Sequence, residues 1–78
     1  MYKEMIVMKD HSVSYVKEIV YEASKFSSHI YIICDNKKVN AKSIMGMLSL
    51  SLKKGDIAFI EAVGDDAEDV INSLSKLI

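Results

Sequence analysis

Ser43 is the side chain best placed for chemistry in this 78-residue chain. It stands directly before an apolar run, Ile44 to Leu52, whose spacing is that of a short helix. A serine at this point is a preferred N-cap, because its hydroxyl accepts a hydrogen bond from a free backbone N–H. A helix N-terminus also attracts anions. The sequence therefore places a phosphorylatable hydroxyl at a helix start, where the positive end of the helix dipole would stabilise a phosphate group. A plain N-cap would give the same local pattern.

The histidines, the cysteine and the acidic residues form no site of another kind. His29 begins a predicted strand without a carboxylate or cysteine at ligand spacing, and Cys34 has the register of a small buried core residue. Together with His11 they lack the spacing of a zinc site. A helix start, rather than a metal site, explains the acidic cluster of Asp65, Asp66, Glu68 and Asp69. We expect no metal, no cofactor and no enzymatic activity, since the chain also lacks a glycine-rich phosphate loop and a nucleophile–base–acid set.

Length and composition set the bounds on organisation and partners. Residues 1–78 are expected to form one domain with one small core, because half of the residues are hydrophobic. The net charge of −1 does not favour a nucleic-acid partner. All ten basic residues are lysines, so bidentate binding of phosphate by a guanidinium is excluded. A single cysteine and the lack of a signal peptide or a long apolar run favour a cytoplasmic protein without a membrane partner.

Periodicity predicts seven elements in the order βαββαβα. The predicted strands cover residues 2–8, 29–34, 37–41 and 57–63, and the predicted helices cover 13–26, 44–52 and 67 to 77 or 78. Ser12 is the expected N-cap of the first helix, and Asp65 or Asp66 that of the last. The sequence Lys53-Lys54-Gly55 is expected to end the second helix. We predict an α+β fold, an open-faced two-layer β-sandwich whose four-stranded antiparallel sheet is covered on one face by helices.

The sheet face away from the helices is unusually apolar. It should carry Ile6, Met8, Tyr31, Ile33, Ile57, Phe59 and Val63. A sheet with two apolar faces needs a second cover. We therefore expect a homodimer, with the two sheets packed face to face or with the first strands exchanged. An error of one residue in the assigned strand register is the alternative explanation.

The segment from Lys38 to Gly46, Lys-Val-Asn-Ala-Lys-Ser-Ile-Met-Gly, resembles the regulatory-serine segment of the HPr phosphocarrier family of the bacterial sugar phosphotransferase system, and most closely its regulatory Crh branch. The similarity extends from about Ala23 through Gly64 into the last helix, and it implies the same open-faced fold. It also implies that HPr kinase/phosphorylase phosphorylates Ser43.

The same resemblance implies a partner for the phosphorylated protein. In the family, the helix after the serine docks on catabolite control protein A, a transcription regulator. Ile44, Met45 and Leu48 match positions of the apolar contact patch, and Gly46 allows close approach. Methionine suits such a surface because its side chain is adaptable.

The chain departs from the family at the phosphocarrier histidine. Carrier members have Gly-Ile-His-Ala-Arg-Pro-Ala at the start of the first helix, and a count without gaps places the histidine at Ser12, the arginine at Ser14 and the proline at Tyr15. His11 stands one residue early, beside the negative charge of Asp10. Crh-type members also lack the histidine, although they retain the arginine. We interpret His11 as a solvated loop histidine, and phosphoryl transfer through His11 as the alternative.

These observations favour a regulatory protein of carbon catabolite control that is phosphorylated at Ser43. A phosphocarrier that uses His11 is one alternative. A dimeric scaffold or interaction protein that uses the apolar sheet face is the other.

Overall fold

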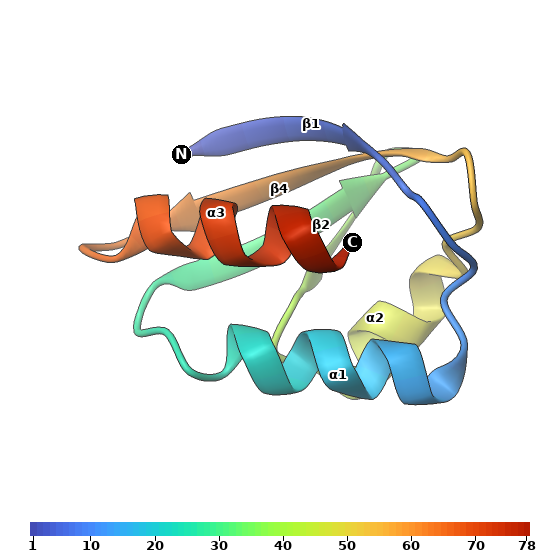
Figure 1. The fold of residues 1–78 in the computed structure, drawn as a ribbon, viewed down its shortest axis with the longest axis horizontal. Helices are drawn as coiled ribbons and strands as arrows, with labels where there is room; N and C mark the ends of the chain where they lie inside the picture. Colours follow the sequence, from blue (N-terminus) through green and yellow to red (C-terminus); the bar gives the residue numbers. More distant parts are fainter.

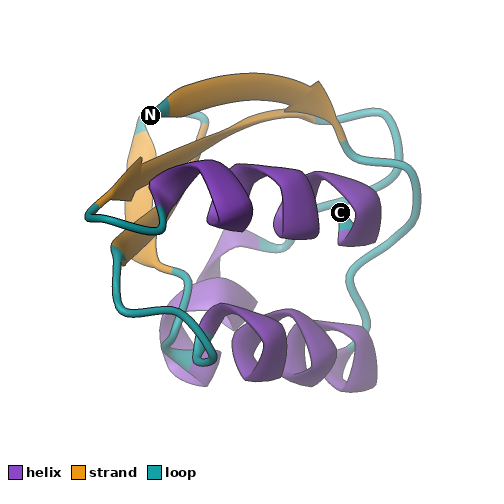
Figure 2. Cartoon of the chain, turned by 60° about the vertical axis from the view of Figure 1, so that its left-hand side comes forward, coloured by secondary structure: helices purple, strands orange, loops and turns teal.

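The computed structural model describes residues 1–78 and contains the seven elements in the predicted order (Figure 1). They are β1 (Tyr2–Ile6), α1 (Val13–Ala23), β2 (His29–Cys34), β3 (Lys37–Asn40), α2 (Ile44–Leu50), β4 (Ile57–Val63) and α3 (Ala67–Leu77). The strands form one antiparallel sheet in the order β1-β4-β2-β3. The helices gather on one face of this sheet (Figure 2), so the prediction of an open-faced two-layer sandwich is confirmed.

The core lies between the sheet and the helices. Strands β2 and β4 contribute every second side chain to it, as their alternating burial shows. Helices α1 and α3 contribute the side chains spaced three and four residues apart. The largest fully buried side chains are Ile19, Ile30, Ile32, Met47, Ile60 and Leu74. Burial of each such side chain contributes about 1.5–3 kcal/mol, which makes this layer the main source of stability.

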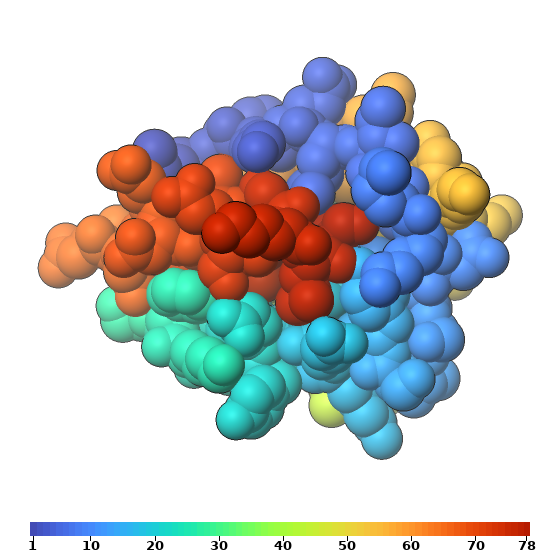
Figure 3. Space-filling model, in the orientation of Figure 1, coloured from blue at the N-terminus to red at the C-terminus, as the bar shows by residue number.

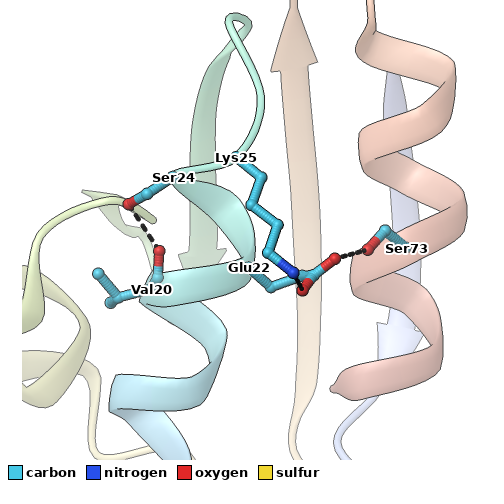
Figure 4. A network of polar contacts seen from close by, with 5 residues as sticks. All are labelled: Val20, Glu22, Ser24, Lys25 and Ser73. Atoms are coloured by element: carbon cyan, nitrogen blue, oxygen red, sulfur yellow. Dashed lines mark hydrogen bonds and ion pairs between the residues drawn. The ribbon is translucent and has the colours of Figure 1, made fainter.

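Helices α1 and α3 lie side by side and are joined by a polar contact at the surface. Ser73 Oγ donates to Glu22 Oε2 at 2.8 Å, and Lys25 Nζ lies 3.0 Å from Glu22 Oε1 (Figure 4). In the space-filling view, α3 crosses the middle of this face between the N-terminal segment and α1 (Figure 3). Helices α1 and α3 therefore form a joined layer over the sheet, and α2 extends this layer over β3.

The predicted ends of β1, α1 and β3 lie too far along the chain. Strand β1 ends at Ile6 rather than residue 8, because the N–H groups of Val7 and Met8 donate to Asp56 and Ile78 outside the sheet. Helix α1 ends at Ala23 rather than residue 26. After Ala23 the chain tightens, with bonds from the N–H groups of Lys25 and Phe26 to carbonyls three residues earlier. Strand β3 ends one residue early, at Asn40.

One predicted helix end uses another residue, and the other lacks the expected side-chain bond. Helix α2 ends at Leu50 rather than residue 52, because Ser51 closes it in the left-handed region with φ 50°. Lys53-Lys54-Gly55 does not form this cap. Gly55, with φ 95°, instead turns the chain into β4, and its N–H donates to the Val7 carbonyl at 2.8 Å. Asp66 occupies the N-cap position of α3 but makes no side-chain cap bond, because its carboxylate bonds to Ser27 and Ser28.

The predicted strand register agrees with the pairing in the sheet. Ile33 pairs with Phe59 across β2 and β4, and Ile6 pairs with Ile57 across β1 and β4, all on the face away from the helices. Tyr31 and Val63 share that face, whereas Met8 lies beyond the end of β1. Some side chains on this face pack against one another and are partly shielded from solvent. Tyr2 stacks on Phe59 with 5.2 Å between ring centroids, and Lys38 binds Glu61 at 2.8 Å while lying 4.6 Å from the Tyr31 ring centroid.

Candidate functional site

Ser43 caps the start of α2, as its place in the sequence predicts. Its backbone is extended, with φ −108° and ψ 117°, and the Gly46 N–H donates to Ser43 Oγ at 3.1 Å. The Met47 N–H donates to the Ser43 carbonyl at 2.9 Å, and the Ser43 N–H donates to the Asn40 carbonyl at 3.0 Å. The side chain is half-buried. These bonds fix the orientation of the hydroxyl at the junction between β3 and α2.

The turn before Ser43 is tied to other parts of the molecule. The Lys42 N–H donates to Asn40 Oδ1 at 2.8 Å, and Lys42 Nζ donates to the Phe26 carbonyl beyond α1 at 2.7 Å. Lys37 Nζ donates to the Ser49 carbonyl near the end of α2 at 3.0 Å. The position of Ser43 therefore depends on contacts to the turn after α1 and to α2, as well as on its own cap.

The apolar side chains after Ser43 divide between surface and core. Ile44 is 39% exposed and Met45 is 79% exposed. Leu48 is half-buried and packs against the core, and Met47 is fully buried. The accessible part of the predicted contact patch is therefore Ile44 and Met45, supported from below by Leu48.

His11 is packed rather than solvated, so the interpretation as a free loop histidine was wrong. Its ring meets the ring of Tyr15 edge to face, with 4.8 Å between centroids, and both ring nitrogens are buried without a hydrogen-bond partner. Burial lowers the pKa of His11, although the carboxylates of Asp10 and Asp56 act against the change. The His11 N–H donates to the Leu52 carbonyl at 3.1 Å, which holds the loop against the end of α2.

Ser12 occupies the start of α1, where the family histidine is expected. It is exposed, and the Tyr15 N–H donates to Ser12 Oγ at 3.3 Å. Ser14 Oγ lies 3.4 Å away. Sequence reasoning missed the role of Tyr15, whose hydroxyl is buried without a partner beside His11. The spacing of four residues between His11 and Tyr15 was the one signal of this contact.

The other candidate residues lie apart from Ser43. His29 is exposed at the start of β2, and Cys34 is buried in the core, where burial raises the pKa of its thiol. No three His, Cys, Asp or Glu side chains lie close enough to hold a metal ion. No helix has the length and apolar character needed to span a membrane.

An open hollow of about 440 Å³ beside the end of β1 is lined by Glu4, Met5, Ile6, Met8 and Ile57.

Comparison with known proteins gives the family. Residues 14–78 match the family described as the PTS HPr component phosphorylation site. The HPr-like protein Crh of Halalkalibacterium halodurans is 42% identical over 59 residues, which cover 76% of this chain and 70% of that protein. The phosphocarrier protein HPr of Mycoplasma capricolum is 44% identical over 55 residues, which cover 70% of this chain and 62% of that protein.

A solved structure agrees with both matches. Crh of Bacillus subtilis, whose crystal structure is described as a dimer with a swapped domain, has a TM-score of 0.82 and 32% identity, and the match covers 91% of this chain and 82% of that one. Relatives named Crh and HPr are thus about equally similar, and the family match begins after His11 and Ser12. The chain belongs to the HPr family of the phosphotransferase system, whose members are phosphocarriers or regulatory proteins rather than enzymes.

Proposed function

We propose that this protein is a regulatory member of the HPr family, acting in carbon catabolite control, and that HPr kinase/phosphorylase phosphorylates it at Ser43. The observation that carries the proposal is the geometry of Ser43. Its hydroxyl stands at a fixed helix start, two residues before the exposed Met45. A kinase therefore finds the acceptor and an apolar docking surface on the same short element.

The phosphorylated protein would then bind a transcription regulator of the catabolite control protein A type. Ile44 and Met45 supply exposed apolar surface, and Leu48 supports them. Gly46 does not add to this surface as expected, because a side chain there would meet Ser43 and Val39 rather than a partner. No acidic side chain lies in the first turn of α2, so a phosphate on Ser43 meets no carboxylate of that turn. The partner would recognise the phosphate and the apolar patch together.

The surroundings of His11 support a regulatory role over phosphoryl transfer. A carrier histidine must present a ring nitrogen to the phosphoryl donor. Both ring nitrogens of His11 are buried, and the residue at the start of α1 is Ser12. With no arginine in the chain, a phosphoryl group on His11 would lack a guanidinium partner.

A homodimer is a second proposal, and it is compatible with the first. Ile6, Ile57 and Val63 are each more than half exposed on the sheet face away from the helices. This face lies opposite α2, so a second copy bound there would leave Ser43 free. The dimer described for Crh of Bacillus subtilis supports self-association, either face to face or with exchanged first strands.

Kinase treatment followed by mass mapping tests the switch. The purified protein, Ser43→Ala and Ser12→Ala are each incubated with HPr kinase/phosphorylase and ATP. Both variants lose one helix cap and about 0.5–2 kcal/mol of stability, so Ser12→Ala is a matched control. We expect one phosphate on the wild type and on Ser12→Ala, and none on Ser43→Ala. Equal labelling of all three proteins would reject the assignment of Ser43.

A further inference from the structure

Gly46 occupies the third position of α2, one turn after the cap residue Ser43. Helices that begin with serine often carry Glu or Gln at this position, and that side chain turns back toward the cap. Here the position has no side chain, and only its backbone N–H reaches Ser43 Oγ, at 3.1 Å. Within the first turn of α2, the hydroxyl of Ser43 is therefore hydrogen-bonded to a backbone N–H and to no side chain.

Local backbone conformation does not explain this glycine. Gly46 lies inside a helix and does not have a positive φ, unlike Gly55 and Gly64. Glycine is less favourable than alanine in a helix interior. A reason for its presence must therefore come from the surroundings of the missing side chain.

A side chain at residue 46 would press on the Ser43 hydroxyl. A Cβ atom added to Gly46 would lie 3.3 Å from Ser43 Oγ and 3.4 Å from Cβ of Val39 on β3. Carbon contacts are normally about 3.5–4.0 Å, so this space is tight on two sides. Val39 packs against the core, which limits how far α2 can shift away from β3. An added side chain would therefore be held against the hydroxyl.

This arrangement leaves the proton of the Ser43 hydroxyl without a hydrogen-bond acceptor in the protein. Ser43 Oγ accepts one hydrogen bond, from Gly46, and donates none to the protein. A kinase needs that proton, because its base takes it as the hydroxyl oxygen attacks phosphorus. A Gln or Glu at residue 46 would bring an acceptor oxygen within a turn of the hydroxyl and compete with the base.

We propose that Gly46 is a positioning residue for phosphorylation of Ser43, because its lack of a side chain keeps the hydroxyl uncovered and its proton free. This inference rests on the proposed function of Ser43. In the step concerned, Ser43 Oγ bonds to the γ-phosphorus of ATP and the bond from that phosphorus to the ADP oxygen breaks. The hydroxyl proton passes to the base of the kinase, and ADP leaves.

Steady-state kinetics on Gly46→Ala and Gly46→Gln test the inference, with HPr kinase/phosphorylase and ATP. Ser49→Gln is the control, because Ser49 is exposed on the same helix and its hydroxyl bonds to the Gly46 carbonyl at 2.6 Å rather than to Ser43. This variant adds a glutamine to α2 and removes that bond, but it places no atom at the cap. We expect kcat to fall about tenfold or more for Gly46→Ala and further for Gly46→Gln, while KM changes by less than about threefold. The thermal midpoint of Gly46→Ala should stay close to that of the wild type, because the gain in helix propensity offsets part of the cost of the tight contact. Ser49→Gln should retain the wild-type kcat.

The outcomes separate this inference from the proposed function. If the wild type is labelled on Ser43 and both Gly46 variants keep its kcat, the inference is wrong and the proposed function stands. If kcat falls only in step with thermal stability, Gly46 has a structural role and the inference is also wrong. If the wild type is not labelled, both fail. Should Gly46→Gln not fold, Gly46→Ala decides alone, since its Cβ requires a shift of only tenths of an ångström.

Discussion

Ser12 and Ser43 cap α1 and α2 in the same way, each accepting a hydrogen bond from the N–H three residues later. Their neighbours distinguish them. Ser43 is followed by the exposed Met45, whereas Ser12 is preceded by His11, whose ring turns inward onto Tyr15. We therefore propose a modification site at Ser43 and a plain cap at Ser12, although the local cap motif is the same.

His11 should make the stability of the protein depend on pH. Its folded pKa lies below the ordinary 6.5 because the ring is buried. As pH falls below 6.5, the unfolded chain takes up a proton that the folded protein does not, so stability is highest above 6.5 and decreases until the folded pKa is reached. Urea unfolding of the wild type and of His11→Phe between pH 8 and pH 5 measures this effect.

The phenylalanine variant keeps the aromatic contact with Tyr15 but cannot titrate. Its unfolding free energy should fall less than that of the wild type over this range. His29→Gln, which removes the other histidine at an exposed position, should behave like the wild type. Parallel pH profiles for the wild type and His11→Phe would contradict the buried position of the ring.

At the scale of elements, Asp66 joins the start of α3 to the turn between α1 and β2. Its carboxylate accepts bonds from the N–H groups of Ser27 at 2.9 Å and Ser28 at 3.0 Å, and from both hydroxyls. Gly64 lies against Ser28 with φ 153°, where a Cβ would lie 2.5 Å from the Ser28 hydroxyl oxygen. The turn therefore requires both the acid and the glycine.

Asp66→Asn should remove an acid-dependent part of the stability. The bonds from Ser28 and Ser27 lower the pKa of Asp66 from 3.8 to about 2. The stabilisation is complete above pH 3.8 and is lost as pH falls through about 2, because protonation removes the acceptor. Thermal unfolding between pH 5 and pH 2 should show a smaller change for Asp66→Asn than for the wild type. Asp65→Asn, at the exposed neighbouring residue, is the control. If the pH profile of Asp66→Asn equals that of the wild type, the bonds from Ser27 and Ser28 to the Asp66 carboxylate do not stabilise the protein in this way.

Local pattern predicted which elements form but not where each one ends. The faces of β2 and β4 and the cap at Ser43 follow from alternation and from a serine before an apolar run. The end of β1 does not, because Val7 and Met8 bond to loop and C-terminal carbonyls distant in sequence. The inward ring of His11 depends in the same way on the Leu52 carbonyl, beyond the end of α2, which no local pattern encodes.

At the scale of the whole molecule, one sheet face is covered by helices and the other is open. Phe59 and Ile33 are paired neighbours near the middle of the open face, and Tyr2 stacks on Phe59. Burial of one such side chain contributes about 1.5–3 kcal/mol, and several together offset part of the cost of association. The ion pair between Lys38 of β3 and Glu61 of β4 crosses this face beside Tyr31 and interrupts the apolar area.

Phe59→Lys combined with Ile33→Lys should therefore give a folded monomer, whereas the wild type should be a dimer at high micromolar concentration. Two charged side chains in the contact would have to lose their hydration without a partner. Light scattering measures the mass, and circular dichroism checks the fold. Glu68→Lys with Asn72→Lys, both exposed on α3, is the control for added charge and should remain dimeric. A monomeric wild type would show that the open face needs no second cover.

We propose that the phosphate of this protein resides on Ser43 and not on His11. The most direct measurement compares two phosphoryl donors on the same purified protein, followed by intact mass and by mapping of the phosphorylated residue. One sample receives HPr kinase/phosphorylase and ATP, and the other receives phosphoenolpyruvate and the first enzyme of the phosphotransferase system. We predict an acid-stable phosphate on Ser43 in the first sample and no phosphate in the second. An acid-labile phosphate on His11 in the second sample, with Ser43 unmodified in the first, would contradict the account.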